Sequence, residues 1–216
     1  MPKAAYLACS FVALAAASGC ATSDEAAPAD ASTDVLREAE WIEGGTCGAL
    51  LEERALEGAT HVPACSAVTY RSNPPSSGDH YPIWAAFQSY AQPVPPGFLV
   101  HDLEHGAVVL AYHCPGGCAA EVAAAQAFID ALPVDPMCAG AGVARRVVMA
   151  PDPALTTRWA ASAWTWTLRA TCFDAEAFGV FVRAHYAQAP ENECANGVDL
   201  TADAGAWCEP ADASAD

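Results

Sequence analysis

Three segments have the apolar and polar pattern of β-strands. Residues 107–112 form an unbroken apolar run, and residues 145–150 are expected to form another apolar strand, which ends at prolines. Short apolar runs of this kind are typical of buried strands. Residues 163–168 instead alternate, with bulky apolar side chains at every second position and threonines between them. This alternation predicts a strand with one buried face.

Two segments have the spacing of amphipathic helices. Residues 119–132 place Val122, Ala125, Ile129 and Leu132 on one stripe, before Pro133. Asp174 is expected to be the N-cap of a second helix that runs to about residue 187. The buried stripe of this second helix is expected to contain Phe178, Phe181, Val182, His185 and Tyr186.

The front half of the chain is irregular. Residues 47–56 have a modest helical pattern, and residues 67–70 are expected to form a short strand. Residues 73–96 form a long loop rich in Pro, Ser and Gly, and long loops inside compact domains often carry function. The chain therefore predicts an α+β fold: a small, mostly antiparallel sheet with two or three packed helices and a long Pro-rich loop.

The N-terminus resembles the signal of an exported lipoprotein. After Lys3, an apolar run over residues 4–16 is too short to span a bilayer, and Ala-Ser-Gly-Cys ends at Cys20. We therefore expect a signal peptide over residues 1–19, with lipid on Cys20 as the membrane anchor. Ala21 follows the cysteine, which favours the outer membrane in a cell that has one.

Domain boundaries follow from composition. Residues 20–40 are expected to be the lipidated cysteine and a disordered tether, because they are rich in Ala, Asp, Ser and Thr and lack apolar periodicity. Residues 41–194 are long enough for a single globular domain. Residues 195–216 are expected to be an acidic C-terminal tail.

The chain contains 10 cysteines. Cys9 lies in the signal and Cys20 takes the lipid, which leaves an even number in an exported chain and predicts stabilisation by up to four disulfides. We expect the local pairs Cys47–Cys65 and Cys194–Cys208. A third local pair lies in Cys-Pro-Gly-Gly-Cys, at positions 114 and 118. We expect these two cysteines to form a disulfide rather than half of a zinc site.

The formal net charge is -17, and Lys3 is the only lysine. So acidic a surface repels nucleic-acid phosphates and anionic lipid headgroups, and it is compatible with cations. DNA and RNA are therefore excluded as expected ligands.

Candidate chemistry is concentrated in two short histidine motifs. His80 lies in Pro-Pro-Ser-Ser-Gly-Asp-His, and His101 and His105 lie in Leu-Val-His-Asp-Leu-Glu-His-Gly. Imidazoles suit zinc or copper. We therefore expect a metal site formed by His80, His101 and His105, with His61 as the fourth ligand and with Asp79 or Glu104 orienting an imidazole.

The second motif also reads as H-x-x-E-H, the inverted zinc-peptidase motif. In that alternative, a zinc-dependent hydrolase, Glu104 is the general base, and Glu176 or Glu191 supplies a distant ligand. The motif needs a helix of several turns, however. We expect at most one turn between Pro95-Pro96-Gly97 and Gly106.

A third alternative has no metal. The histidines then bond to backbone groups and fix the Pro-rich loop, as buried histidines commonly do. His113 and His185 are expected to be structural in any case. In this alternative, the protein is a structural or partner-binding envelope lipoprotein, with an envelope protein contacting the aromatic loop residues Tyr81, Trp84, Phe87 and Tyr90.

The chain resembles the bacterial domain-of-unknown-function 3105 family. The resemblance is carried by the two histidine motifs, His61-Val62, Trp84, Pro93-Val94 and the strand end Val148-Met149-Ala150-Pro151. The resemblance covers roughly residues 61–191. It implies an exported or membrane-tethered protein and implies no activity. The family pattern includes histidines that match His61, His80, His101 and His105, which favours a shared site. The cysteines at 114, 118, 138 and 172 depart from that pattern.

Overall fold

The computed structural model describes residues 40–41 and 47–201. The expected signal peptide, Cys20, the tether up to residue 39 and Cys208 lie outside the described residues. The elements in chain order are β1 (Glu40–Trp41), β2 (Ala49–Glu53), α1 (Pro96–Glu104), β3 (Val108–Tyr112), α2 (Ala119–Ala131), the short 3-10 helix η1 (Ala139–Ala141), β4 (Val147–Pro151), β5 (Trp159–Ala163), β6 (Trp166–Ala170) and α3 (Ala175–His185).

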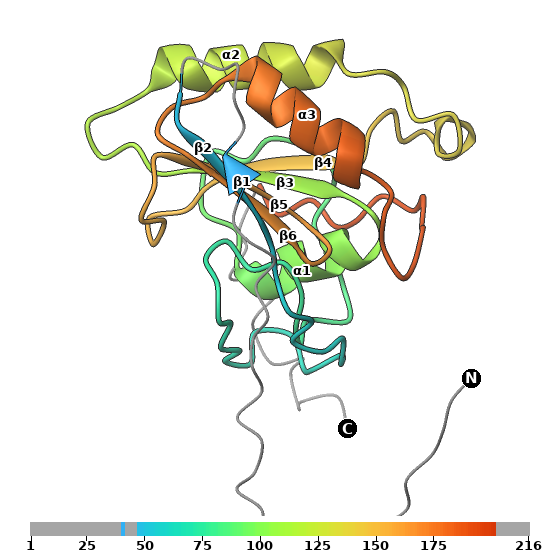
Figure 1. The fold of residues 1–216 in the computed structure, drawn as a ribbon. Coiled ribbons are helices and arrows are strands. Elements are labelled where there is room, and N and C mark those ends of the chain that lie inside the picture. Colours follow the sequence, from blue (N-terminus) through green and yellow to red (C-terminus); the bar gives the residue numbers. More distant parts are fainter. Residues whose placement is uncertain (1–39, 42–46, 202–216) are drawn as a thin grey trace, which may run out of the picture. The chain divides into compact units, whose positions relative to one another are not determined.

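The strands form one sheet in the order β1-β2-β6-β5-β3-β4 (Figure 1). The pairs β1–β2, β2–β6, β5–β6 and β3–β5 are antiparallel. Only β3 and β4 pair in parallel among the named strands of the described residues, and a parallel pair needs a long crossover, which α2 provides. The expected α+β class with a mostly antiparallel sheet is confirmed.

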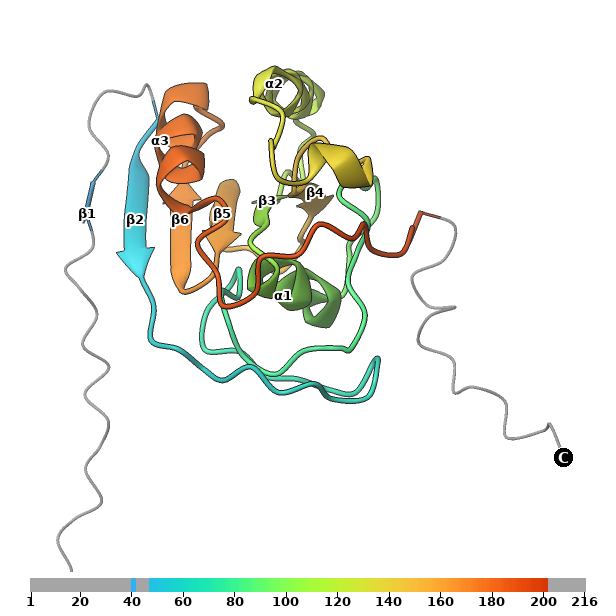
Figure 2. The same cartoon turned by 90° about the vertical axis from the view of Figure 1, so that its right-hand side faces the viewer.

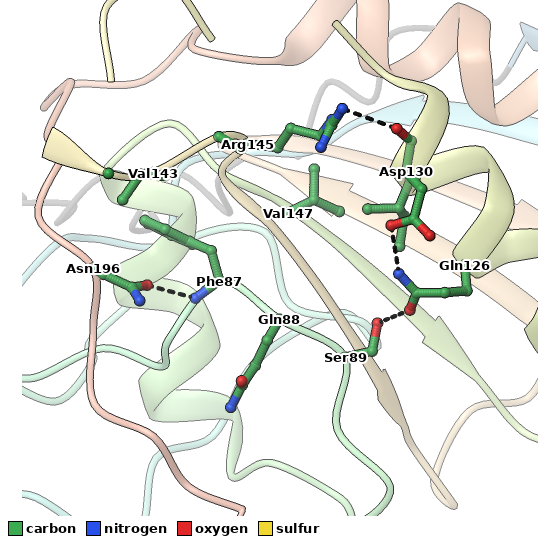
Figure 3. Close-up of a pocket in the computed structure, with 12 residues that line it drawn as sticks. Phe87, Gln88, Ser89, Gln126, Asp130, Val143, Arg145, Val147 and Asn196 are labelled. Carbon is green, nitrogen blue, oxygen red and sulfur yellow. Dashed lines mark hydrogen bonds between the residues drawn. The ribbon is translucent and has the colours of Figure 1, made fainter. Parts of the chain in front are cut away.

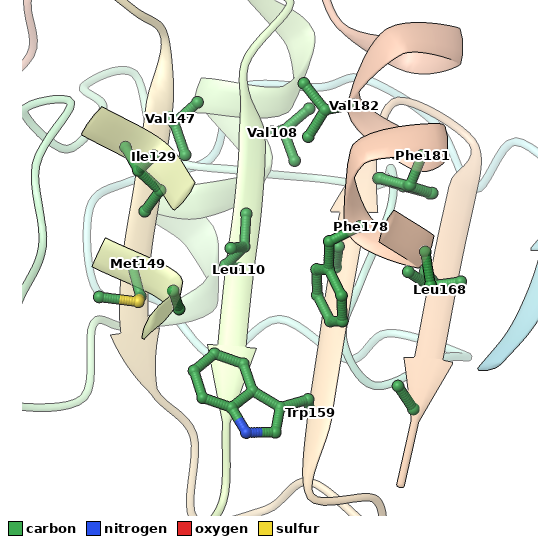
Figure 4. Close-up of a cluster of buried hydrophobic side chains, with 14 of the residues drawn as sticks. Val108, Leu110, Ile129, Val147, Met149, Trp159, Leu168, Phe178, Phe181 and Val182 are labelled. Carbon is green, nitrogen blue, oxygen red and sulfur yellow. The ribbon is translucent and has the colours of Figure 1, made fainter. Parts of the chain in front are cut away.

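Both faces of the sheet are covered. Helices α2 and α3 lie over one face, whereas α1 and the long loops lie over the other (Figures 1 and 2). The first face forms the larger core, in which Trp159, Phe178 and Phe181 are fully buried (Figure 4). None of the helices in the described ranges is long and apolar enough to cross a membrane.

Strand β3 shows why its segment is apolar at every position. Val108 and Leu110 point into the core below α2 and α3, whereas Val109 belongs to the second core, which α1 and the Pro-rich loop cover. Because successive side chains of a strand point to opposite faces, a strand covered on both sides has no solvent-facing position. The predicted buried strands at residues 107–112 and 145–150 are confirmed as β3 and β4.

The two predicted helices are confirmed as α2 and α3. The Asp174 carboxylate accepts hydrogen bonds from the backbone N–H groups of Glu176 and Ala177, so this residue is the N-cap of α3 as expected. An N-cap carboxylate satisfies amide groups that the first helical turn leaves without partners.

Three local predictions are wrong. Residues 47–56 contain β2 rather than a helix, because antiparallel pairing with β6 overrides the weak helical pattern. Residues 67–70 contain no strand. The predicted single strand at 163–168 is a hairpin: β5 ends at Ala163, the chain turns at Trp164 and Thr165, and β6 begins at Trp166. The alternation continues through the turn, where Thr165 has φ of 60°, an uncommon value for a β-branched residue.

Two of the disulfides in the described residues join distant segments. Cys47 pairs with Cys172, and Cys138 pairs with Cys194. The expected local pairs Cys47–Cys65 and Cys194–Cys208 are therefore wrong, because β2 lies beside β6 and brings Cys47 next to the chain that follows β6. Cys65 is also disulfide-bonded. The expected Cys114–Cys118 disulfide is confirmed.

Candidate metal centre

Helix α1 carries half of the candidate site. It runs for nine residues from Pro96, so the expectation of at most one turn is wrong. Proline is favoured at the first helical position, where its missing N–H would have no partner and its fixed φ suits a helix. His101 and Glu104 lie three residues apart, and His105 follows as the C-cap. This spacing places the three side chains on one face of the helix.

Two loop segments deliver the other half. His61 and His80 form an isolated parallel β-bridge, in which the N–H of Val62 donates to the His80 carbonyl at 2.8 Å and the N–H of His80 donates to the Thr60 carbonyl at 3.0 Å. These backbone bonds place the two imidazoles side by side, with ring centroids 4.9 Å apart.

The Pro-rich loop is docked on the first turn of α1. The N–H of Tyr81 donates to the Gly97 carbonyl at 3.1 Å. A Cβ atom on Gly97 would lie 2.6 Å from the Tyr81 ring, so the close approach of loop and helix requires glycine at this position. The contact fixes the loop that presents His80 against the helix that presents His101.

Within the described ranges, His61, His80, His101 and Glu104 form a group that could hold a metal ion, with one potential ligand atom from each residue lying within 4.8 Å of the others. Glu104 Oε2 lies 2.9 Å from His80 Nε2 and 3.9 Å from His61 Nε2. The His101 ring centroid is 4.9 Å from the centroids of both other imidazoles. We call these four residues the His3Glu group.

Backbone carbonyls fix the proton positions of two imidazoles in this group. His80 Nδ1 is 2.8 Å from the Gly78 carbonyl oxygen, and His101 Nδ1 is 2.6 Å from the Tyr81 carbonyl oxygen. A carbonyl oxygen only accepts, so each Nδ1 carries a hydrogen and donates it. In the neutral rings, each Nε2 therefore presents a lone pair to the group, which is the tautomer that a metal ligand needs.

His80 Nε2 has no hydrogen bond within the described part of the chain, although it is fully buried. Its 2.9 Å approach to Glu104 Oε2 lacks hydrogen-bond alignment, so a lone pair of the neutral ring faces a carboxylate oxygen at short range, which is unfavourable. A buried nitrogen without a partner is costly, and a bound cation would satisfy both this nitrogen and the carboxylate.

Burial also keeps His101 neutral. It lowers the pKa of His101 to about 4, although the hydrogen bond to the Tyr81 carbonyl raises that pKa, and the adjacent imidazoles lower it further. An imidazole must be neutral to bind a metal. At neutral pH, His101 therefore has the required charge state.

His105 lies beside the His3Glu group. Its Nε2 is 3.1 Å from His101 Nε2 and 3.3 Å from Glu191 Oε2, and the Trp84 ring packs against it at a centroid distance of 4.4 Å. Burial lowers the pKa of His105, whereas Glu191 and Glu193 oppose this effect. The carboxylate is an acceptor, so it favours a hydrogen on His105 Nε2 and thus the tautomer opposite to those of His80 and His101.

The remaining candidates are not members of the His3Glu group. Asp79 and Glu176 are exposed. His113 Nδ1 contacts the Leu155 carbonyl at 2.8 Å, and His185 stacks on Trp166 at a centroid distance of 4.3 Å. Glu104 is thus the predicted carboxylate that lies closest to the imidazoles of His61 and His80.

The aromatic loop is largely part of the core. Tyr81 and Tyr90 are buried in the cluster below α1, whereas Trp84 and Phe87 are partly buried. Trp84 also packs against His101 at a centroid distance of 4.9 Å. Its indole is therefore a wall of the histidine site.

Sequence analysis missed a buried ionic network behind the site. Arg146 is 1 % exposed and donates two hydrogen bonds to Asp135 and one to the His105 carbonyl. The only sequence signal was an arginine at the start of an apolar strand. Nothing in the linear pattern indicates that its side chain turns toward the C-terminal end of α1.

A separate pocket of about 290 Å³ lies between α2, the loop at residues 87–89 and the chain before β4 (Figure 3). Its polar groups bond to one another: Ser89 donates to Gln126, Gln126 donates to Asp130, and Arg145 donates to the Asp130 carbonyl. No histidine or cysteine lines it. The pocket therefore has fewer groups for metal chemistry than the His3Glu group.

Comparison with known proteins agrees with the sequence resemblance. The model of a family described as proteins of unknown function (DUF3105) matches residues 61–197. This range begins at His61 and includes the whole His3Glu group as well as His105 and Glu191. Neither a search of curated proteins nor a search of solved structures found a match. Because the matched range covers more than half of the sequence, the chain belongs to the domain-of-unknown-function 3105 family.

Proposed function

We propose that this protein binds a divalent transition metal ion, Zn²⁺ or Cu²⁺, through His61, His80, His101 and Glu104. The observation that carries the proposal is the convergence of His80 Nε2 and Glu104 Oε2 at 2.9 Å inside a group in which carbonyl bonds to Nδ1 leave the Nε2 atoms of the neutral His80 and His101 rings without a hydrogen. A set of nitrogen ligands with one carboxylate oxygen suits zinc and copper better than the oxygen-seeking Mg²⁺ or Ca²⁺.

The four ligands differ in burial, and this difference supports a site that an ion can reach from one side. His80, His101 and Glu104 are buried, whereas the His61 side chain is 53 % exposed. A metal ion can therefore reach the buried ligands from the His61 side. The net charge of -17 attracts cations to the surface as a whole.

The proposal includes an extracytoplasmic location, with lipid on Cys20 as the anchor. The signal pattern and the disulfides support it, because structural disulfides persist in oxidising compartments. Exchange of Cys20 for Ser should move the protein from the membrane fraction to the soluble fraction of the cell envelope. Retention of the variant in the membrane would contradict a lipid anchor.

The test of metal binding is the metal content of the exported chain carrying Cys20→Ser, folded in an oxidising compartment without a histidine tag. After exposure to zinc and copper and removal of free ions, we expect close to one ion per chain by mass spectrometry. The double variant His80→Ala/His101→Ala should lose this bound ion. His113→Ala removes a histidine outside the group and is the matched control. An absence of metal in the parent protein would contradict the proposal and favour a structural or partner-binding role, in which the partly exposed Trp84 and Phe87 contact an envelope protein.

A second candidate function is metal-dependent hydrolysis, and two observations favour it. Helix α1 runs for nine residues and is therefore longer than the single turn expected from the sequence, as the H-x-x-E-H motif requires. Glu191 supplies a distant carboxylate, which lies 3.3 Å from His105 Nε2. In this arrangement, His101, His105 and Glu191 bind zinc, and Glu104 activates water. The 2.9 Å contact between Glu104 and His80 favours the His3Glu group as the first candidate.

A further inference from the structure

The guanidinium of Arg146 joins three chain segments behind the candidate metal centre. Nε and Nη2 donate to Asp135 Oδ2 at 3.1 and 2.9 Å. Nη1 donates to the His105 carbonyl at 2.7 Å and also to Asn192 Oδ1. Arginine suits this position because its planar fork offers donors in several fixed directions.

One of these contacts fixes the C-terminal end of α1. His105 is the C-cap, and carbonyls at a helix end lack intrahelical partners. A Cβ atom on Gly106 would lie 2.8 Å from Arg146 Nη1, so glycine permits the close approach of the guanidinium to this end. The position of the last helical turn, which carries Glu104, thus depends on Arg146.

A second contact fixes the segment at residues 187–192, which closes over the same turn. The N–H of Glu191 donates to the Glu104 carbonyl at 3.1 Å, and the N–H of Ala187 donates to the Gly106 carbonyl at 2.9 Å. The Glu191 side chain reaches His105. Asn192, the neighbour of Glu191, is the residue that Arg146 contacts.

The orientation of the guanidinium is itself fixed. The Tyr186 hydroxyl donates to Asp135 Oδ2 at 2.8 Å, and the backbone N–H of Arg146 donates to that hydroxyl at 2.9 Å. Asp135 and Arg146 are both buried. Removal of one member would leave the other as an uncompensated buried charge, which is strongly unfavourable.

We propose that Arg146 is a positioning residue of the metal centre: it holds the last turn of α1, which carries the ligand Glu104, against the Glu191–Asn192 segment. It acts through the His105 carbonyl and Asn192 and does not touch the ion. This inference rests on the proposed metal binding by the His3Glu group. Interactions that orient ligands from outside the coordination sphere commonly change metal affinity by about 10- to 100-fold.

The test compares Arg146→Lys with Arg158→Lys in the Cys20→Ser full chain. Lysine keeps the charge beside Asp135 but cannot span Asp135, the His105 carbonyl and Asn192 at once. Arg158 also pairs with a carboxylate, Glu121, at 2.6 Å but lies away from the site. Readouts are Zn²⁺ affinity by competition with a chelator and the visible spectrum of bound Co²⁺, which reports ligand geometry.

We expect Arg146→Lys to weaken Zn²⁺ binding by about 10- to 100-fold and to alter the Co²⁺ spectrum, with Arg158→Lys unchanged. Equal affinity and an identical spectrum in Arg146→Lys would overturn the inference while leaving metal binding intact. A parent protein without metal binding would instead overturn the proposed function. If Arg146→Lys does not fold, Asn192→Ala decides: weaker Zn²⁺ binding supports the inference, and unchanged binding overturns it.

Discussion

The Nδ1 atom of His101 lies 2.6 Å from the carbonyl oxygen of Tyr81. This contact helps to join the helix to the Pro-rich loop, and it fixes which nitrogen of a buried imidazole carries the hydrogen when the ring is neutral. The same carbonyl therefore contributes both to packing and to the chemistry of the site. Small displacements of the loop should be detectable as changes in metal binding.

Exchange of Gly97 for Ala should disturb this relationship. The new methyl group would lie 2.6 Å from the Tyr81 ring, so this buried ring or the loop that carries it must move. Overpacking of this kind typically costs about 1 to 3 kcal/mol. We expect a lower urea midpoint together with weaker Zn²⁺ binding. Gly116→Ala is the control, because a Cβ at Gly116 meets no atom within 4 Å; equal effects of both variants would contradict the close-contact argument.

Glu104→Gln and His105→Ala separate the two candidate functions. If the His3Glu group binds the ion, Glu104→Gln loses a charged ligand and weakens binding, whereas His105→Ala retains metal. If His101, His105 and Glu191 bind it, His105→Ala loses the metal, whereas Glu104→Gln keeps the metal and abolishes hydrolysis. Metal content and Zn²⁺ affinity of both variants give the answer. Retention of metal in Glu104→Gln with loss in His105→Ala would contradict the first assignment.

Trp84 should report occupancy by copper. Its ring centroid lies 4.9 Å from that of His101 and 4.4 Å from that of His105, so Cu²⁺ bound in the group would quench its fluorescence at short range. We expect saturable quenching at about one equivalent of Cu²⁺, and a much smaller effect in Trp84→Phe. Quenching of the same size in the variant would place the bound copper elsewhere.

The free energy of unfolding should decrease below neutral pH, in part because of His185. Burial lowers its pKa from the ordinary 6.5, so the unfolded chain takes up a proton at a pH where the folded protein does not. The stability contributed by the neutral ring is present above pH 6.5 and is lost as the pH falls from there toward the lower pKa of the folded state.

His185→Phe removes this linkage and also a buried Nε2 without a partner in the described residues. We expect its urea midpoint to decrease less between pH 7 and pH 5 than that of the parent protein, while packing against Trp166 is retained. His101 and His105 shift in the same direction, so part of the slope should remain. An identical slope in the variant would show that His185 does not contribute.

The disulfides should differ in their contributions to stability. Cys47–Cys172 joins residues 125 apart, whereas Cys114–Cys118 joins residues four apart. A longer closed loop restricts the unfolded chain more, and the loop-entropy relation gives about 5 kcal/mol for the first and about 2 kcal/mol for the second. Thermal unfolding of the two double alanine variants tests this order. A larger loss for the short loop would contradict it.

Sequence analysis predicted the elements whose pattern is set locally. The strands β3 and β4 are short apolar runs, the helices α2 and α3 each have an apolar stripe, and the Asp174 N-cap depends only on adjacent amide groups. The predictions were wrong where contacts between segments distant in the sequence determine the local structure. Strand β2 forms by pairing with β6, and Cys47 meets Cys172 because of that pairing.

The candidate site shows the same division. The spacing of His101 and Glu104 places them on one helical face once the helix exists. The prolines before them predict at most one turn, whereas Pro96 is the first residue of α1. The 2.9 Å approach of His80 to Glu104 and the burial of Arg146 are products of loop docking and core packing. No linear pattern contains that information.

Helix α1 uses its two sides for separate tasks. Phe98, Val100 and Leu103 pack into the core below the sheet, whereas His101 and Glu104 belong to the His3Glu group. If the group binds a metal as proposed, the residue types on that side could be exchanged, for example histidine for cysteine, while the anchoring residues on the other side stay unaltered. Substitutions on this one helix would then change the metal preference, while the rest of the fold stays unchanged.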